Sequence, residues 1–259
     1  MGEFITLNGV DTYFEVQGEG DPVVYLHGGL STIESGAAQI GALAHRYRVY
    51  APERRGHGRT PDTDAPFSYD TMAEDTIAFI REVVGGGAHL VGWSDGGNIG
   101  LLLALRQPVL VSRLVVIGSN YRYDGVVPEL AAEPVDPNDP GMAFLREAYG
   151  AISPDRPDHW PVVVEKLERM VKSEPKLTVE DLARIQAPTL VMVGDDDFPT
   201  LAHTISLYES LPHGQLAIIP GASHLVAMEK PELVNQLILD FLAGGEPMTM
   251  FPLRRAPAH

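Results

Sequence analysis

The sequence predicts an α/β domain in which a mostly parallel, eight-stranded sheet is covered by helices on both faces. Short apolar runs alternate along the chain with longer segments whose apolar residues recur at helical spacing. The runs are too continuous for half-exposed strands, which favours buried parallel strands. At 259 residues the chain can bury a large core, so we expect one domain that carries an insertion.

Eight segments are predicted as strands. The first two, 3–7 and 10–16, flank Asn8-Gly9, a dipeptide suited to a tight hairpin turn, so they should pair antiparallel. The remaining apolar runs should form the buried sheet: 22–26, 49–51, 88–93, 114–117, 189–193 and 216–219.

Five helices should pack between these strands and cover both faces of the sheet. Pro108 marks the end of the third helix, because a residue that precedes proline disfavours helical geometry. The predicted helices span 34–44, 69–84, 98–106, 200–210 and 231–243.

The segment 120–184 interrupts this alternation. It holds a Pro- and Asp-rich loop at 133–141 and continues with helix-like stretches in place of a strand. We interpret it as a helical lid inserted after the sixth strand, so that 1–119 and 185–245 form the core. Thr178-Val-Glu-Asp181 predicts a capping box at the start of the last lid helix. The tail, 246–259, has no periodicity and is expected to be loosely held.

Composition and charge exclude several classes of function. The chain has no cysteine, and therefore no disulfide, thiolate nucleophile or cysteine-based zinc site. It has no leader-like start and no apolar stretch of about 18 residues, so we expect a cytoplasmic protein with no membrane partner. The formal charge of -16 disfavours nucleic acid as a partner. Such an excess of acidic residues more often reflects an acidic surface that aids solubility, and a cleft that attracts cationic substrates is the alternative.

The sequence also lacks the usual signatures of metals and nucleotide cofactors. There is no HExxH run, paired-histidine spacing or calcium loop. Gly85-Gly86-Gly87 precedes a predicted strand, whereas a dinucleotide-binding glycine run opens a helix. We therefore expect no metal and no cofactor.

The pentapeptide Gly-Trp-Ser-Asp-Gly at 92–96 lies between a predicted strand and a predicted helix. This context indicates a nucleophile elbow, a sharp turn that lifts a serine hydroxyl clear of the sheet. Side chains at Gly92 and Gly96 would collide in so tight a turn. An ordinary strand-to-helix turn is the alternative, but the residues described next favour Ser94 as a nucleophile.

A serine needs a general base, and the base needs a carboxylate to orient it. His224 follows the last predicted strand, and Asp197 follows the one before it, which gives the chain order expected for this elbow. Loops at strand ends are where such sheets hold their sites. Asp196 and, less directly, Asp124 are alternatives for the acid.

Negative charge on a substrate oxygen needs preorganised hydrogen-bond donors. The backbone N–H of Asp95, at the start of the helix after Ser94, is one candidate. The second is the N–H of Gly29, in the glycine-rich turn after the third strand.

With these motifs, the chain resembles the α/β-hydrolase superfamily over all but its tail. The match includes ERRGHGR at 53–59, with Glu53 where the family usually has aspartate, a departure that concerns structure more than chemistry. The resemblance implies an eight-stranded α/β-hydrolase fold. Serine at position 94 argues against the haloalkane dehalogenase and epoxide hydrolase branches, which use aspartate as the nucleophile.

The run LVGWSDGG at 90–97 is particularly similar to the valacyclovir hydrolase, or biphenyl hydrolase-like, esterases. In that group the acidic residue after the serine helps to recognise the α-amino group of amino-acid esters, and the resemblance gives this role to Asp95. An acid in the first helical turn is also favoured by the helix dipole whatever the substrate. Residues expected to line the substrate pocket are Leu30, Trp93, Tyr121, Phe144 and Trp160. For the aromatic residues of the lid segment, Tyr121, Tyr123, Phe144, Tyr149 and Trp160, the core of the lid is the alternative.

Together these features predict a serine hydrolase that cleaves small carboxylic esters through an acyl-enzyme formed on Ser94. The same residues serve lactonases, C–C bond hydrolases, cofactor-free perhydrolases and aminopeptidases, and the fold does not choose among them. An alternative of another class is a lidded ligand receptor with vestigial hydrolysis.

Overall fold

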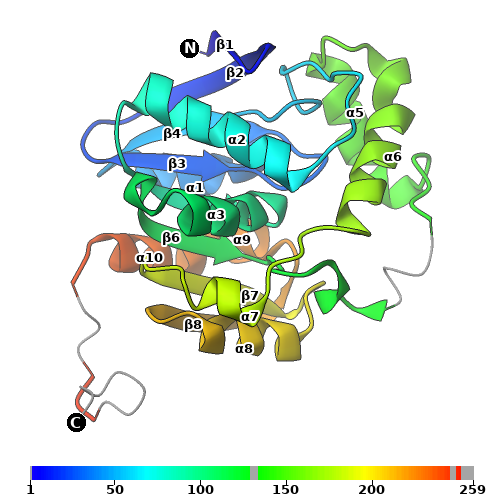
Figure 1. The fold of residues 1–259 in the computed structure, drawn as a ribbon. Helices are drawn as coiled ribbons and strands as arrows, with labels where there is room; N and C mark the ends of the chain where they lie inside the picture. The colour runs from blue at the N-terminus through cyan, green and yellow to red at the C-terminus, as the bar shows by residue number, and fades with distance from the viewer. Residues whose placement is uncertain (1, 129–133, 246–248, 252–259) are drawn as a thin grey trace.

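The structure is a computed structural model that describes residues 2–128, 134–245 and 249–251 (Figure 1). Most of the tail predicted for 246–259 therefore lies outside the described residues. Among the residues that are described, no helix combines the length and apolar character needed to cross a membrane.

A single eight-stranded sheet runs through the molecule in the order β1-β2-β4-β3-β5-β6-β7-β8. Its first hairpin turns at Asn8 and Gly9, whose φ angles of 48° and 80° suit the tight turn that the dipeptide predicts. The antiparallel strands at this edge are β1 (Glu3–Leu7) and β2 (Val10–Gln17), and β2 pairs antiparallel with β4 (Arg48–Pro52). The others are parallel: β3 (Pro22–Leu26), β5 (Ala88–Trp93), β6 (Val111–Ile117), β7 (Thr189–Asp196) and β8 (Gly214–Ser223).

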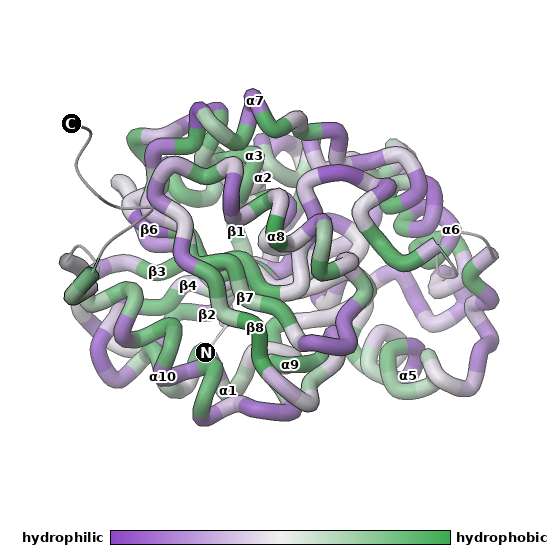
Figure 2. The backbone as a smooth tube through the Cα atoms, turned by 90° about the horizontal axis from the view of Figure 1, so that it is seen from below, coloured by the Kyte–Doolittle hydropathy of each residue, from purple (hydrophilic) through white to green (hydrophobic). Residues whose placement is uncertain are grey.

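Each parallel strand feeds a core on both faces of the sheet. In β3, Val24 and Leu26 enter one core, whereas Val23 and Tyr25 enter the other. Helices α2 (Tyr69–Phe79), α3 (Asp95–Arg106) and α8 (Leu201–Ser210) pack against the first core. Helices α1 (Ala37–Leu43), α9 (Val226–Glu229) and α10 (Pro231–Leu242) pack against the second. The predicted fold class is confirmed, and Figure 2 shows hydrophobic residues along β7 and β8.

Several predicted boundaries need correction. The helix predicted from 98 begins at Asp95, directly after Ser94. Gly96 lies in the first turn of this helix although glycine is a poor helix former. A Cβ at this position would lie 2.1 Å from the Leu26 carbonyl oxygen, so the close packing of the helix on β3 requires glycine. The predicted helix 69–84 is α-helical only to Phe79 and continues as a π-helical turn, Ile80–Val84. The helix predicted for 34–44 opens with a 3₁₀ turn, Ile33–Gly36.

Between β6 and β7 the described chain forms helices α5 (Ala143–Ile152), α6 (Trp160–Val171) and α7 (Val179–Leu182). The predicted capping box is confirmed: Thr178 and Asp181 exchange side-chain and backbone hydrogen bonds at the start of α7. In Figure 1, α5 and α6 lie together at the end of the sheet toward which the arrow of β3 points. This is the end at which the loops after the parallel strands emerge.

Candidate active site

Ser94 occupies the sharp turn between β5 and α3. Its φ of 53° and ψ of -118° are costly for a residue with a side chain, so surrounding contacts must hold them. The Ser94 N–H donates to the Ile117 carbonyl oxygen at 2.7 Å, and the Ser119 hydroxyl donates to the Ser94 carbonyl oxygen at 2.9 Å. A Cβ on Gly92 would lie 2.4 Å from the Gly96 carbonyl carbon. The glycines thus give the turn the space that the sequence pattern implies.

The structure brings Ser94, His224 and Asp197 together. The His224 Nε2 lies 3.0 Å from Ser94 Oγ, and its Nδ1 lies 2.6 Å from Asp197 Oδ1. When Nδ1 carries its proton toward the carboxylate, Nε2 is left to accept the serine proton. The Asp197 side chain is fully buried and also accepts the Phe198 N–H at 2.6 Å. This is the geometry of a nucleophile, a base and an orienting acid.

The alternative acids lie elsewhere. Asp196 is exposed at the end of β7. Asp124 forms an ion pair with Arg122 at 2.7 Å, which holds the pKa of the Asp124 carboxyl below its ordinary value. Of these three carboxylates, it is that of Asp197 that contacts the His224 ring.

Two aromatic side chains fix the His224 imidazole in place. The Phe198 ring stacks on it with 4.2 Å between ring centres, and the Trp93 indole N–H donates to the His224 carbonyl oxygen at 3.0 Å. Trp93, expected to line the pocket, therefore supports the histidine loop. Phe198 was not anticipated from the sequence. The one feature of the sequence that could have indicated this contact is the position of Phe198 directly after the candidate acid Asp197.

Gly29 lies against Asp95, the residue that follows Ser94. A Cβ on Gly29 would lie 2.6 Å from Asp95 Oδ2 and 3.1 Å from Leu167 Cδ1 of α6. This loop therefore passes between the elbow and helix α6. Leu30 continues the turn with a φ of 53° and packs at the margin of the first core.

The Asp95 carboxylate is buried, with 5% of the residue exposed. The Tyr69 hydroxyl donates to Oδ1 at 2.5 Å, whereas Oδ2 is buried without a hydrogen-bond partner among the described residues. Burial raises the pKa of this carboxyl, and the positive charge of Arg54 acts against that rise. The sequence did not anticipate Tyr69 or Arg54 at this position.

The aromatic residues expected to line a pocket lie apart. Trp160 is 1% exposed and packs against Tyr149 inside the helical segment, with its indole N–H on the Pro137 carbonyl oxygen at 2.9 Å. Tyr121 stacks on His203, whereas Phe144 is largely exposed. Trp160 thus follows the alternative that these aromatic residues form the core of the lid.

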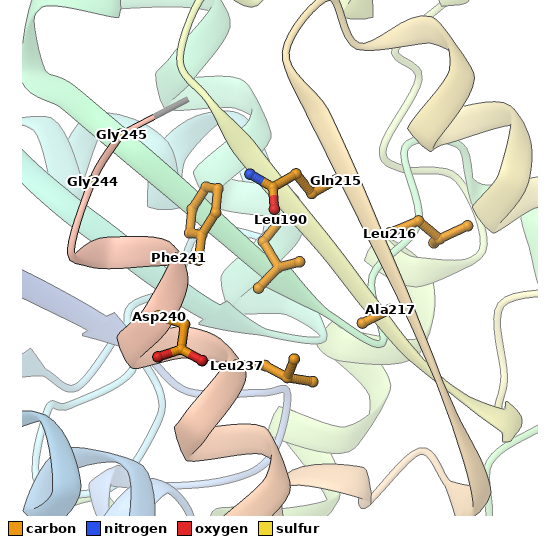
Figure 3. Close-up of a pocket in the computed structure, with 9 residues that line it drawn as sticks. All are labelled: Leu190, Gln215, Leu216, Ala217, Leu237, Asp240, Phe241, Gly244 and Gly245. Atoms are coloured by element: carbon orange, nitrogen blue, oxygen red, sulfur yellow. The ribbon is translucent and has the colours of Figure 1, made fainter. Parts of the chain in front are cut away.

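Two surface hollows lie away from Ser94. One, of about 240 Å³, is formed by β7, β8 and α10 near the beginnings of those strands, the opposite end from the candidate site (Figure 3). Another, of about 360 Å³, lies beside Asp62 and Lys166. Within the described residues, no group of three or more His, Cys, Asp or Glu side chains is arranged to hold a metal ion.

Comparison with known proteins places this geometry in context. The sequence profile described as "Alpha/beta hydrolase family" matches residues 23–237. A non-heme chloroperoxidase from Streptomyces lividans is 30% identical over 264 residues, covering 85% of this chain and 95% of that protein. The serine hydrolase BPHL of Homo sapiens is 25% identical over 256 residues, covering 92% of this chain and 85% of that protein.

Among solved structures, the carboxylesterase CesB from Bacillus subtilis is similar with a TM-score of 0.74. It is 25% identical, and the match covers 95% of this chain and 92% of that one.

Proposed function

Because the chain belongs to the alpha/beta hydrolase family, we propose that it is a serine hydrolase that cleaves carboxylic esters of small molecules. The observation that carries this proposal is the hydrogen-bonded series of Ser94, His224 and Asp197, joined at 3.0 Å and 2.6 Å at the end of the sheet. The similarity to a carboxylesterase supports it.

In the proposed reaction Ser94 Oγ attacks the ester carbonyl carbon while His224 Nε2 takes the hydroxyl proton. The tetrahedral intermediate collapses, the alcohol leaves with the proton from His224, and an acyl group remains on Ser94. Water then attacks this acyl group with His224 as the base, which releases the acid and restores Ser94. Asp197 keeps Nδ1 protonated and stabilises the imidazolium that forms in each half.

The backbone N–H groups of Asp95 and Gly29 are the proposed donors to the oxyanion of each intermediate. Two positions support this assignment: Asp95 opens α3 directly after Ser94, and Gly29 lies against Asp95. We further propose that 120–184 acts as a lid. This is supported by Leu167 of α6, whose Cδ1 lies 3.1 Å from the position that a Cβ on Gly29 would occupy, beside the proposed oxyanion donor.

The proposal is tested by steady-state hydrolysis of p-nitrophenyl acetate and butyrate. Ser94→Ala and His224→Ala should each lower kcat about 10⁶-fold, which is the loss seen when the serine or histidine of a catalytic triad is removed from a serine protease. Ser112→Ala, on the exposed start of β6, is the matched control and should keep wild-type turnover. Hydrolysis retained by a clean Ser94→Ala preparation would overturn the mechanism.

The same assay separates the rival reactions. The panel includes lactones, ring-cleavage diketones and aminoacyl amides. It also includes esters supplied with hydrogen peroxide, because a relative is named a non-heme chloroperoxidase. The kcat/KM for hydrolysis of an ester by water should exceed the kcat/KM for each of these rival reactions. A single equivalent of product released without turnover would instead support a receptor.

A narrower substrate class is favoured by one observation, the unpartnered Oδ2 of Asp95 beside Gly29. We propose that this oxygen accepts a hydrogen bond from the α-amino group of an amino-acid ester. A hydrogen bond to a charged group is worth about 1.5 to 3 kcal/mol, so amino-acid esters should exceed their des-amino analogues about tenfold to a hundredfold in kcat/KM. Asp95→Asn keeps the backbone N–H and should bring the ratio close to one. Equal kcat/KM values in the wild type would contradict this assignment.

A further inference from the structure

The peptide bond between Gly28 and Gly29 is held from one side by side-chain donors. The Gly28 carbonyl oxygen accepts hydrogen bonds from Ser31 Oγ at 2.7 Å, Arg54 Nη2 at 2.8 Å and His27 Nδ1 at 2.8 Å. In a trans peptide the carbonyl and the following N–H point in opposite directions. Donors that fix the Gly28 carbonyl therefore also fix the direction of the Gly29 N–H.

The hydrogen bonds of His27 define its tautomer. The Arg54 backbone N–H donates to Nε2 at 3.2 Å, so Nε2 must accept and Nδ1 must carry the proton. Burial lowers the pKa of His27 well below its ordinary value, which keeps the ring neutral. His27 is thus a fixed donor to the Gly28 carbonyl.

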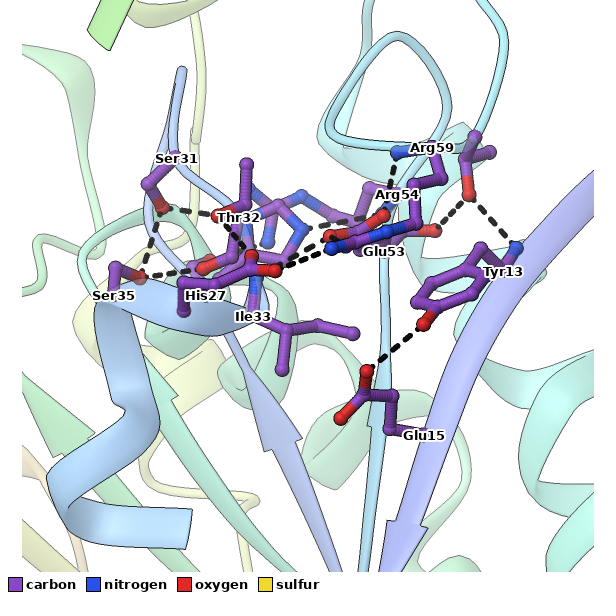
Figure 4. Close-up of polar contacts among 12 residues, drawn as sticks. Tyr13, Glu15, His27, Ser31, Thr32, Ile33, Ser35, Glu53, Arg54 and Arg59 are labelled. Carbon is purple, nitrogen blue, oxygen red and sulfur yellow. Dashed lines mark hydrogen bonds and ion pairs between the residues drawn. The ribbon is translucent and has the colours of Figure 1, made fainter. Parts of the chain in front are cut away.

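Arg54 contributes the charged donor of this set. Its guanidinium reaches two consecutive carbonyl groups, those of His27 and Gly28, from the loop after β4. Figure 4 draws Arg54 together with His27 and Ser31. The residue is 6% exposed, and the buried Asp95 carboxylate supplies the nearby negative charge. A buried cation is costly unless its hydrogen bonds are used, and a charged donor polarises the peptide that it contacts.

We propose that Arg54 is a positioning residue that aims the Gly29 N–H at the substrate oxyanion, with Ser31 and His27 as its neutral partners. This inference rests on the proposed function, because it requires an oxyanion to form beside Ser94. Arg54 does not touch the substrate in this proposal. It acts through the Gly28–Gly29 peptide bond.

The next residue supplies a matched control. Arg55 is 7% exposed, close to the value for Arg54, but its guanidinium pairs with Asp75 at 2.7 Å and 2.9 Å. Both arginines are therefore buried with hydrogen-bonded guanidinium groups, but it is Arg54 whose guanidinium contacts the Gly28 carbonyl oxygen. A structural role alone predicts similar consequences for the two.

The experiment compares Arg54→Met with Arg55→Met, using p-nitrophenyl acetate and an aryl trifluoromethyl ketone whose adduct with serine carries an oxyanion. Loss of one oxyanion donor lowers kcat about 10²- to 10³-fold, so a misaimed Gly29 N–H should cost about 10²-fold in kcat, with KM changed less than about twofold. The affinity for the ketone should fall by a similar factor. Arg54→Lys should recover part of both losses, whereas Arg55→Met should lower the Tm and leave kcat unchanged.

Equal kcat values for folded Arg54→Met and Arg55→Met would overturn the inference, as would an unchanged ketone affinity in Arg54→Met. If Arg54→Met does not fold, Ser31→Ala removes a different donor to the same carbonyl. Ser31→Ala should lower kcat several-fold and should lower the affinity for the ketone by the same factor. A wild-type value for either quantity contradicts the inference.

A fluorophosphonate that labels Ser94 keeps the two proposals distinguishable. Labelling of Ser94 together with an inactive Ser94→Ala variant leaves the proposed function standing even where Arg54 fails its test. An active Ser94→Ala variant removes both.

Discussion

The loops around Ser94 and the helical segment between β6 and β7 place their charges in contrasting surroundings. Near the candidate site the charged side chains are buried: Glu53 is 0% exposed and Asp95 is 5% exposed. In the helical segment, by contrast, Arg156 and Asp158 form a pair whose side chains are 78% and 71% exposed. Exposed pairs contribute about 0 to 1 kcal/mol, whereas buried groups respond strongly to the loss of a partner. Charged side chains near the site are therefore expected to matter more for stability and geometry than the exposed Arg156–Asp158 pair of the helical segment.

The two regions meet at Asp62. This carboxylate, on the core loop after β4, accepts hydrogen bonds from Lys166 Nζ at 2.7 Å and from His159 Nε2 at 2.8 Å. Its side chain is 3% exposed, so this contact is as buried as those of the site although its partners come from the helical segment. Substitutions in each region can therefore test how far the contrast extends.

The largest effect is expected at the buried acid of the site. Asp197→Asn should lower kcat about 10⁴-fold, because an amide leaves His224 in the wrong tautomer. Asp196→Asn, one residue earlier and exposed, is the control and should stay within about twofold of wild type. Steady-state kinetics on p-nitrophenyl butyrate check both. The reverse ranking would assign the acid to Asp196.

An intermediate effect, on stability, is expected at Glu53. Burial raises the pKa of its carboxyl from 4.5 to about 7, although the Arg59 N–H at 2.5 Å and guanidinium at 2.8 Å act in the opposite direction. Between these values the unfolded chain releases the proton and the folded chain keeps it. The free energy of unfolding therefore falls as the pH rises from about 4.5 to 7, by up to about 3 kcal/mol, and levels off above the folded pKa.

Glu53→Gln should remove most of this fall, as measured by urea unfolding at pH 5, 6, 7 and 8. Glu34→Gln is the matched control, since Glu34 shares Arg59 as a partner but is more exposed and has a lowered pKa. It should leave the slope between pH 5 and 7 in place. A Glu53→Gln variant with the wild-type slope would show that Glu53 does not hold its proton.

The smallest effect is expected where the lid meets the core. Lys166→Met leaves Asp62 with one fewer partner and should cost about 1 to 3 kcal/mol of stability, with faster amide hydrogen exchange in α5 and α6. Lys172→Met, at the end of the same helix, loses a partly exposed pair with Glu168, worth about 0.3 to 0.5 kcal/mol. Equal exchange rates in the two variants would place the attachment of the lid outside the Asp62 contact.

The sequence predicts the sheet and its covering helices because burial imposes a periodicity on each strand and helix. It also points to Ser94 and His224, since a tight turn and the chain order of the strands restrict which residues can stand there. The sequence does not predict that helix α3 begins at Asp95, because glycine is a poor helix former and the close approach of Gly96 to Leu26 is visible only in the packed structure.

The residues that support the site, Arg54 and Tyr69, could not be predicted either, because their contacts also depend on packing. Arg54 contacts Gly28 across 26 positions, and Tyr69 contacts Asp95 across the same separation, so neither pair leaves a local pattern. The sequence leaves both roles open for Trp160, because an aromatic residue on a helix of this segment looks the same in sequence whether it faces a substrate or its own core. The burial of Trp160 decides between these roles.

The central claim is that the Ser94 hydroxyl is the nucleophile, and mapping of a covalent label tests it most directly. A fluorophosphonate should add one equivalent per chain, on the peptide that contains Ser94, and hydrolysis of p-nitrophenyl butyrate should fall in proportion to the labelled fraction. His224→Ala should label far more slowly at the same site. Full hydrolysis by a chain fully labelled at Ser94, or inactivation by a label on another residue, would contradict the account.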